Sequence, residues 1–155
     1  MDCAFFYNPK LFELTNSKLV PYVYINDTVH KTRGFLIASG NIAGEKMHFI
    51  VNHWPSRAAA SPARERAGEQ VRAIKDSLLR EDSAAKIVIM GDMNDDPMDK
   101  SMAVALGAKR KPADVGPTDL YNPWWDTLKK GYGTLMYKGK WNLFDQIVFT
   151  GNSVS

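Results

Sequence analysis

The stretch of sequence that decides the fold is KIVIMGDMNDDP, residues 86–97. Its first half is short, apolar and rich in β-branched residues, which is typical of a buried strand. The run ends at Gly91, and an Asp, an Asn and two further Asp follow. Carboxylates this close together repel one another unless a cation, a proton or a hydrogen-bond donor offsets their charge. The pattern indicates either polar chemistry at the end of a central strand or a turn that leads into a helix, with Asp96 as N-cap and Pro97 at its first position.

The composition is that of one globular domain spanning residues 1–155, because a chain of this length with 45% hydrophobic residues can bury a core. A net charge of +3 is compatible with a phosphate-bearing partner, but it is well short of the basic stripe of a dedicated nucleic-acid binder. The single cysteine, Cys3, excludes an internal disulfide and a cysteine-based zinc site. No stretch has the length of a membrane span or the pattern of a signal peptide, so we expect a soluble chain without an integral membrane segment, of undetermined compartment.

The hydrophobic pattern predicts an α/β protein with a strand-rich first third. Strands are expected at 2–7, 19–25, 33–39 and 46–52, with a hairpin loop at 41–45 between the last two. Residues 63–80 carry apolar side chains at helical spacing and predict an amphipathic helix. Beyond the strand that ends at Met90, we expect a short helix at 98–106 stopped by Gly107, an irregular helix within 119–130, and a hairpin of strands 133–137 and 143–150.

Two further motifs place polar residues on apolar strands. In VNHWPSR, residues 51–57, His53 falls where a strand ends and Arg57 follows closely. Both can donate hydrogen bonds to phosphate oxygens, although a lone His more often satisfies a backbone carbonyl. In WNLFDQIVF, residues 141–149, Asp145 interrupts the strand. An inward-facing carboxylate there is costly unless it is paired, so Asp145 either accepts backbone hydrogen bonds or orients a catalytic group.

Taken in this order, the motifs at 52–57, 91–95 and 141–147 resemble the endonuclease/exonuclease/phosphatase superfamily, the DNase I-like fold. The opening residues 2–7 and the segment 32–35 are also similar to this family, so the resemblance covers nearly the whole chain. It implies part of a four-layer α/β/β/α sandwich, with mostly antiparallel sheets and flanking helices. The implied reaction is attack of water on a phosphoester, assisted by Mg²⁺ or Mn²⁺.

The resemblance also implies roles for individual residues. Asp92 matches the aspartate that aligns or deprotonates the attacking water, and Asn94 matches its partner, which contacts the phosphate or a metal ion. His53 matches the histidine that stabilises charge on the phosphoryl oxygens. Asp145 matches the aspartate that orients a second catalytic histidine.

Two further groups of residues follow from the resemblance. The expected phosphate contacts are Arg33, Asn52 and Arg57. The expected metal ligands are Asp92 and Asn94, which form a partial site. The implied substrate is a phosphoester within a nucleic acid, a sugar phosphate or a phospholipid head group. The aromatic residues Tyr121, Trp124 and Trp125 could stack a base or lie against a lipid or sugar, and the alternative is a packed structural loop.

The chain departs from the family pattern at both ends. The family's N-terminal strand with an Asn, its metal-binding Glu and its C-terminal Ser-Asp-His segment have no counterpart in these residues. We therefore expect an incomplete domain of a metal-dependent phosphodiesterase. The alternative is a catalytically inactive domain that binds a partner or forms a homo-oligomer through an exposed sheet edge.

Overall fold

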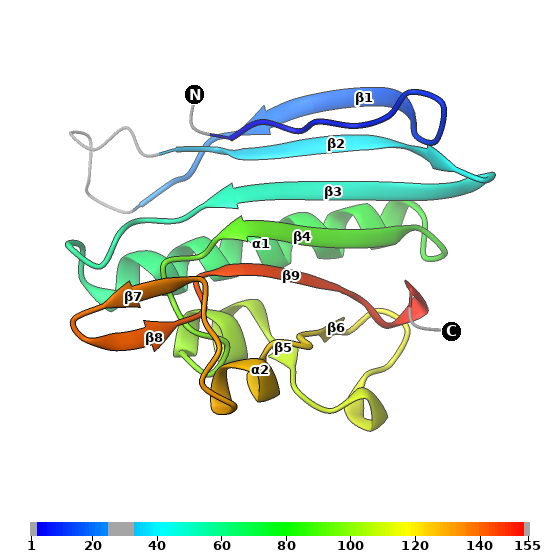
Figure 1. The fold of residues 1–155 in the computed structure, drawn as a ribbon. Helices are drawn as coiled ribbons and strands as arrows, with labels where there is room; N and C mark the ends of the chain where they lie inside the picture. Colours follow the sequence, from blue (N-terminus) through cyan, green and yellow to red (C-terminus); the bar gives the residue numbers. More distant parts are fainter. Residues whose placement is uncertain (1–2, 25–32, 154–155) are drawn as a thin grey trace.

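A single mixed sheet organises the chain in the computed structural model, which describes residues 3–24 and 33–153 (Figure 1). Its seven strands lie in the order β1-β2-β3-β4-β9-β6-β5, and the neighbours are antiparallel except for the parallel pairs β3–β4 and β5–β6. The strands are β1 (Glu13–Val20), β2 (Phe35–Ile42), β3 (Glu45–His53), β4 (Lys86–Asp92), β5 (Ala108–Lys109), β6 (Leu120–Tyr121) and β9 (Asp145–Thr150). A separate hairpin consists of β7 (Leu135–Tyr137) and β8 (Lys140–Asn142).

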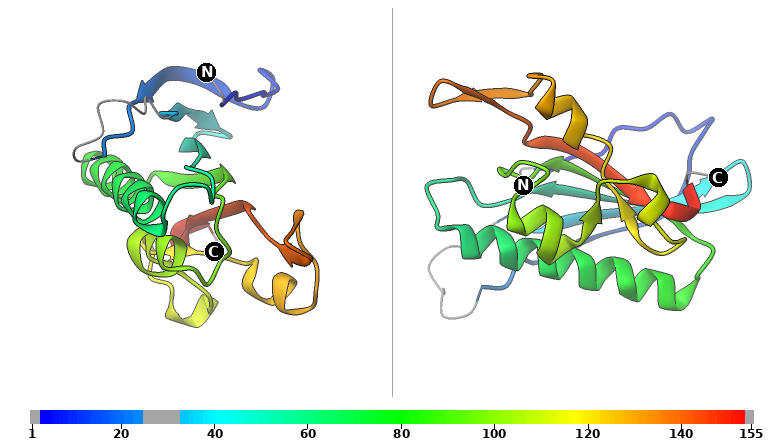
Figure 2. Two further views of the ribbon diagram at one scale, coloured as in Figure 1. Left: turned by 90° about the vertical axis from the view of Figure 1, so that its left-hand side faces the viewer. Right: turned by 90° about the horizontal axis from the view of Figure 1, so that it is seen from below.

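Helix α1 (Ser61–Glu81) covers one face of this sheet (Figure 2). Its apolar stripe, which includes Ala67 and Val71, packs on inward-facing strand residues such as Ile50 and Ile89 to form the core. The π-helix η1 (Ser101–Leu106) lies against α1 at Gly68, where an added Cβ would lie 2.4 Å from the Ser101 carbonyl oxygen. The remaining short helices are α2 (Trp125–Lys129) and the 3₁₀ turns η2 (Pro112–Asp114) and η3 (Gly151–Ser153).

The opposite face of the sheet is partly open. Near β2 and β3 it is covered by an aromatic cluster in which the rings of Phe5 and Phe12 contact that of Phe49. On β9, Ile147 is 45% exposed. A mostly antiparallel sheet with α1 and η1 on one face and a partly open second face is a portion of the predicted α/β/β/α sandwich, so the predicted fold class is confirmed.

Several predicted elements match the structure closely. The strand at 46–52 is β3, the helix at 63–80 is α1, and the strand that ends at Met90 is β4, which continues to Asp92. β2 and β3 form the expected hairpin, with a tighter connection than predicted. Ala43 and Gly44 both have positive φ, as the two-residue turns that suit twisted hairpins require.

Other predictions were wrong in their placement. Residues 3–7 do not form a strand, and the second predicted strand is replaced by β1, which begins at Glu13; Ile25 lies outside the described residues. β1 is an edge strand exposed on both faces, so it lacks the apolar alternation that reveals a strand in sequence. Residues 33–39 correspond to β2, which is shifted to Phe35–Ile42.

The last two predicted elements are also rearranged. β7 pairs with the short β8 through the turn Lys138-Gly139, whereas β9 leaves the hairpin and pairs with β4 and β6. Within 119–130, strand β6 precedes the short helix α2, and the positive φ of Gly131 follows that helix. Gly107 ends η1 in the left-handed conformation, as predicted. Among the described residues, no helix is both long and apolar enough to cross a membrane.

Candidate active site

Three strand ends meet at one end of the sheet, on the left in Figure 1. The parallel strands β3 and β4 end at His53 and Asp92, and the antiparallel strand β9 begins beside them at Asp145. His53 is the register partner of Asp92, and Asp92 is the register partner of Asp145. Because paired residues on neighbouring strands point to the same face, these three side chains share the open face of the sheet.

The backbone at this end of the sheet requires a glycine. Gly91 has a φ of +132°, and a Cβ at this position would lie 2.0 Å from the Asn52 carbonyl oxygen. A side chain on residue 91 would therefore push β3 and β4 apart immediately before Asp92. The chain is held beyond Asp92 by two backbone hydrogen bonds, from the Trp54 N–H to the Asp92 carbonyl and from the Met93 N–H to the Phe144 carbonyl.

His53 and Asp92 are close enough to act together. The His53 Nε2 atom lies 3.7 Å from Asp92 Oδ2, and each side chain is about one-third exposed. Arg33, just before β2, places its Nη1 atom 2.5 Å from the same His53 nitrogen. A guanidinium donates and cannot accept, so this contact requires His53 Nε2 to carry a lone pair. The geometry joins three of the predicted site residues in one cluster.

Asn94 and Asp145 lie on either side of Asp92. The Asn94 N–H donates to Asp92 Oδ1 at 2.9 Å, and its side-chain amide donates to the Trp54 carbonyl at 3.0 Å. Asn94 has a φ of +51°, a conformation that Asn tolerates better than most residues. The Asp145 side chain is exposed, which differs from the inward orientation expected from the sequence. The side chain of β9 that points inward here is Gln146, because Gln146, Val148 and Thr150 form the buried face of that strand.

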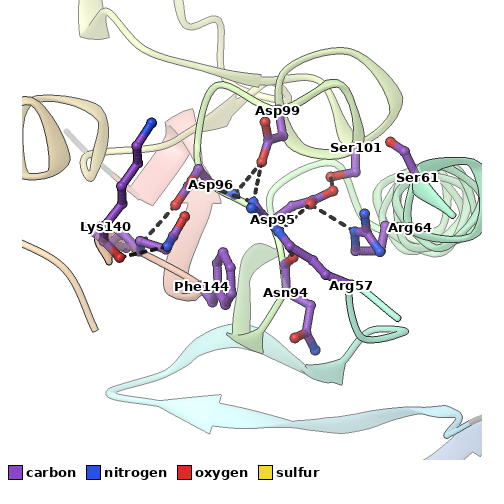
Figure 3. A network of polar contacts seen from close by, with 12 residues as sticks. Arg57, Ser61, Arg64, Asn94, Asp95, Asp96, Asp99, Ser101, Lys140 and Phe144 are labelled. Atoms are coloured by element: carbon purple, nitrogen blue, oxygen red, sulfur yellow. Dashed lines mark hydrogen bonds and ion pairs between the residues drawn. The ribbon is translucent and has the colours of Figure 1, made fainter. Parts of the chain in front are cut away.

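The remaining acidic residues of the 86–97 stretch are tied to two arginines (Figure 3). Arg57 Nη2 donates to Asp99 Oδ2 at 3.0 Å and lies 3.5 Å from Asp96 Oδ2, and the Arg57 Nε atom donates to the Asn94 carbonyl at 3.1 Å. Its guanidinium also lies 4.5 Å above the centre of the Phe144 ring. These contacts already engage Arg57, and a phosphate contact by this residue stays a prediction.

Asp95 is the buried member of this network. It forms an ion pair at 2.8 Å with Nε of Arg64, and its Oδ2 atom accepts a hydrogen bond from Ser101 at 2.7 Å. Burial raises the pKa of the Asp95 carboxyl, and the hydrogen bond from Ser101 and the charge of Arg64 oppose that shift. Burial also raises the pKa of Asp96, whose Oδ1 atom accepts from the Leu143 N–H at 2.7 Å. Asp96 therefore joins two distant segments instead of capping a helix.

Asn52 lies in the interior of this end of the sheet. Its side-chain amide donates to the Ile50 and Met90 carbonyls, and its Oδ1 atom accepts from the Trp54 indole N–H. With 3% exposure, the side chain connects β3 to β4. A contact between Asn52 and a phosphate stays a prediction that would require these hydrogen bonds to rearrange.

Sequence reasoning missed two residues that position the site. Gln146 is 1% exposed, and its amide donates to the carbonyls of Asp95 and Leu143 at 2.8 and 2.9 Å. The Thr134 hydroxyl accepts hydrogen bonds from the backbone N–H groups of Phe144 and Asp145. The available signal for Gln146 was its polarity within an apolar strand, the same signal that singled out Asp145. Nothing local to Thr134 indicates its partners.

The aromatic residues at 121–125 are packed against the sheet. Tyr121 contacts the Phe149 ring edge to face, and the Trp124 indole N–H donates to the Ile147 carbonyl at 2.8 Å. Arg110 lies 6.0 Å from the centre of the Trp125 ring. A packed structural loop, the alternative to a stacking surface for a base, lipid or sugar, accounts for these contacts.

The described residues do not by themselves form a metal centre. Within residues 3–24 and 33–153, no group of three or more His, Cys, Asp or Glu side chains has the arrangement of a metal centre. Asp92 and Asp145 nevertheless form a cross-strand pair of like charges, and such pairs are destabilising when unscreened. Over the same described ranges, the Asp145 carboxylate forms no hydrogen bond or ion pair. Oxygen donors of this kind suit Mg²⁺, which binds one or two carboxylates and completes its shell with water and substrate phosphate.

Comparison with solved structures defines the class of fold. Truncated TDP2 from Caenorhabditis elegans superposes with a TM-score of 0.64 at 16% identity, covering 92% of this chain and 54% of that one. The human Nocturnin catalytic domain with bound sulfate gives a TM-score of 0.62 at 15% identity, covering 91% of this chain and 49% of that one. A mannosyl-6-phosphatase from Bacteroides thetaiotaomicron gives a TM-score of 0.62 at 14% identity, covering 93% of this chain and 55% of that one. The fold is therefore DNase I-like, and the chain spans about half the length of these proteins.

The family follows from a match along the whole chain. The model of the Endonuclease/Exonuclease/phosphatase family matches residues 1–155, and the chain belongs to this family. This confirms the resemblance drawn from the three motifs. No curated protein sequence matches the chain. Membership associates the chain with phosphoester hydrolases of the nuclease and phosphatase type.

Proposed function

We propose that this chain carries the nucleophile-activating portion of a phosphoesterase active site, and that the reaction depends on Mg²⁺ or Mn²⁺. The observation that supports this most directly is the shared face of His53, Asp92 and Asp145 on three adjacent strands. Two carboxylates and an imidazole that share an exposed end of a rigid sheet can bind water, phosphate and a cation together.

Asp92 is the proposed base or orienting group for the attacking water. Its Oδ1 atom is held by the Asn94 N–H, which leaves Oδ2 facing His53. The hydrogen bond fixes the carboxylate orientation, as a water-activating group requires. His53 is proposed to donate to a phosphoryl oxygen from Nε2, a role in which the phosphate replaces Arg33 as the neighbour of that nitrogen.

Asp92, Asn94 and Asp145 are the residues proposed to hold the divalent cation. When bound, the cation would polarise the phosphoryl group and stabilise the leaving oxygen. The like-charge pair of Asp92 and Asp145 supports this assignment because a cation would remove their repulsion. The substrate is proposed to be a phosphoester of a nucleic acid, a sugar phosphate or a phospholipid head group.

The test is hydrolysis of bis-p-nitrophenyl phosphate by this chain with Mg²⁺, with Mn²⁺ and with EDTA. Asp92→Asn and His53→Gln are each expected to lower the rate by about 100-fold or more, as the loss of a positioned acid or base does. Asp126→Asn is the matched control, because this exposed carboxylate on α2 pairs with Arg110. Turnover in EDTA, or full activity of Asp92→Asn, would contradict the proposal, and so would a folded protein without turnover.

A second candidate function is self-association through the open sheet face. The exposed Ile147 on β9 favours association through this face. Association through a sheet edge, which the sequence predicted, is less favoured, because the edge strand β1 is polar and irregular in register. Sedimentation velocity should then show a dimer that Ile147→Lys dissociates. Val104→Lys is the control, because Val104 is 67% exposed on η1. A monomer at high protein concentration would exclude this function.

A further inference from the structure

Arg57 lies in the turn that connects β3 to α1. The turn is held by Arg64, whose Nη1 atom donates to the Ser56 and Ala59 carbonyls at 3.0 and 3.1 Å. The Arg57 side chain is 28% exposed and reaches the loop that follows β4 (Figure 3). One side chain therefore connects the two segments that leave the ends of β3 and β4.

The guanidinium of Arg57 contacts this loop at two points. Its Nε atom donates to the Asn94 carbonyl at 3.1 Å, and its Nη2 atom donates to Asp99 Oδ2 at 3.0 Å. The same Asp99 oxygen accepts from the Asp96 N–H at 2.8 Å. The guanidinium also lies 4.5 Å from the centre of the Phe144 ring. The protein therefore fixes both the position and the orientation of this planar group.

Asn94 is the residue whose conformation depends on this contact. Its φ of +51° lies in the left-handed region, which is unfavourable for a residue other than glycine and persists only where the surroundings enforce it. Its N–H donates to Asp92 Oδ1 at 2.9 Å, and its side-chain amide donates to the Trp54 carbonyl at 3.0 Å. Arg57 binds the remaining backbone group, the carbonyl. Because both backbone groups of residue 94 are tied, its N–H stays directed at Asp92.

The charges around Arg57 disfavour a direct contact with a phosphate. Carboxylate oxygens of Asp95 and Asp96 lie 3.5 Å from its Nε and Nη2 atoms, in addition to the bonded oxygen of Asp99. Two arginines, Arg57 and Arg64, thus share three carboxylates. A phosphate at Arg57 would approach these negative charges, and it would have to replace hydrogen bonds that hold the loop.

We propose that Arg57 is a positioning residue that acts on the reaction through Asn94, whose N–H orients the Asp92 carboxylate, and not through the substrate. The inference rests on the proposed function, because it concerns the orientation of Asp92. A lysine has the charge of an arginine but lacks the planar fork that donates in two fixed directions at once. A lysine can still bind a phosphate as a point charge. The behaviour of Arg57→Lys therefore distinguishes positioning from a phosphate contact.

The test compares Arg57→Lys and Arg57→Gln with the wild type by two measurements. The first is kcat and KM for bis-p-nitrophenyl phosphate with Mn²⁺. The second is the hydrogen-exchange rate of the Asn94 amide, followed by ¹⁵N NMR in EDTA, which needs no turnover. Circular dichroism confirms that each variant is folded.

Two further variants complete the test. Asp99→Asn keeps Arg57 and removes the charge of its partner, and it carries the test if the Arg57 variants do not fold. Arg66→Gln is the matched control, because Arg66 also donates from Nε to a backbone carbonyl, that of Val23, and from Nη1 to a carboxylate, that of Glu69.

Both Arg57 variants are expected to lower kcat about 10- to 100-fold and to leave KM within about twofold, because a misplaced group costs rate and not binding. The Asn94 amide should exchange at least about tenfold faster, as the loss of a hydrogen bond to a carboxylate implies. Asp99→Asn should change kcat and exchange in the same direction by smaller factors. Arg66→Gln should leave both unchanged.

A raised KM with unchanged kcat, or wild-type kcat in Arg57→Lys, would overturn the inference and assign Arg57 to the phosphate. An unchanged exchange rate of the Asn94 amide in Arg57→Gln would also overturn it, because the loop would then be held without this side chain. A wild type without turnover contradicts the proposed function alone. The exchange rates of the Asn94 amide then decide the inference on Arg57, so the two failures are distinguishable.

Discussion

Replacing Gln146 with leucine should release the loop that carries the candidate active site. Gln146 is nearly fully buried and makes three hydrogen bonds of 2.8–2.9 Å, to the carbonyls of Asp95 and Leu143 and from the amide of Asn122. Leucine is close in volume, so a cavity contributes little. Three buried polar groups would lose their partner, and each costs roughly 1–3 kcal/mol when left unsatisfied.

The expected loss of unfolding free energy for Gln146→Leu is therefore about 3–9 kcal/mol. That is a large share of the roughly 5–15 kcal/mol that stabilises a domain. Urea denaturation followed by tryptophan fluorescence measures it, and an unchanged m value would show that the loss lies in stability.

Gln70→Leu is the matched control. The side chain of Gln70 hydrogen-bonds to the exposed backbone of Val23, where water can replace it. The control should cost less than about 1 kcal/mol. A loss below about 1 kcal/mol for Gln146→Leu would refute the reasoning, because the buried partners would then have found other donors and acceptors.

Three further predictions concern stability. Gly91→Ala should cost more than about 3 kcal/mol, because its Cβ would lie 2.0 Å from the Asn52 carbonyl oxygen. Burial lowers the pKa of His48 from 6.5, so the unfolded chain binds more protons as the pH falls through that value and the fold loses stability. The urea midpoint should therefore decrease between about pH 7.5 and 5.5 in the wild type and change less in His48→Gln. The hydrogen bond from Lys109 lowers the pKa of Asp119, so Lys109→Gln should cost less than about 1 kcal/mol at neutral pH, and this cost should vanish as the pH falls through the lowered pKa.

Each of these predictions has a contrary outcome. Gly131→Ala is the control for Gly91→Ala, because Gly131 also has a positive φ but a Cβ added there would meet no atom within 4 Å. Equal costs for the two glycine variants would mean that backbone strain, not the contact with Asn52, decides the effect. A midpoint that does not change with pH would contradict the account of His48. A cost of Lys109→Gln that persists in acid would show that Asp119 is not its origin.

The amino-acid sequence by itself determined the family, the fold class and the positions of His53, Asp92, Asn94 and Asp145 at strand ends. These features depend on short-range information: an apolar run long enough for a buried strand, and polar residues at its end. The helix at 63–80 was predictable for the same reason, because its apolar period repeats over several turns.

Only the tertiary structure decided which polar side chains face the open side of the sheet and which join its segments. Asp145 and Gln146 are neighbours with similar polarity, and the pairing of β9 with β4 directs one outward and the other into the core. Arg64 likewise finds its partner, Asp95, across a long stretch of chain. Their roles depend on contacts between residues distant in sequence, and no local pattern of polarity records such contacts, because the same side chain can be satisfied by water, backbone or a distant partner.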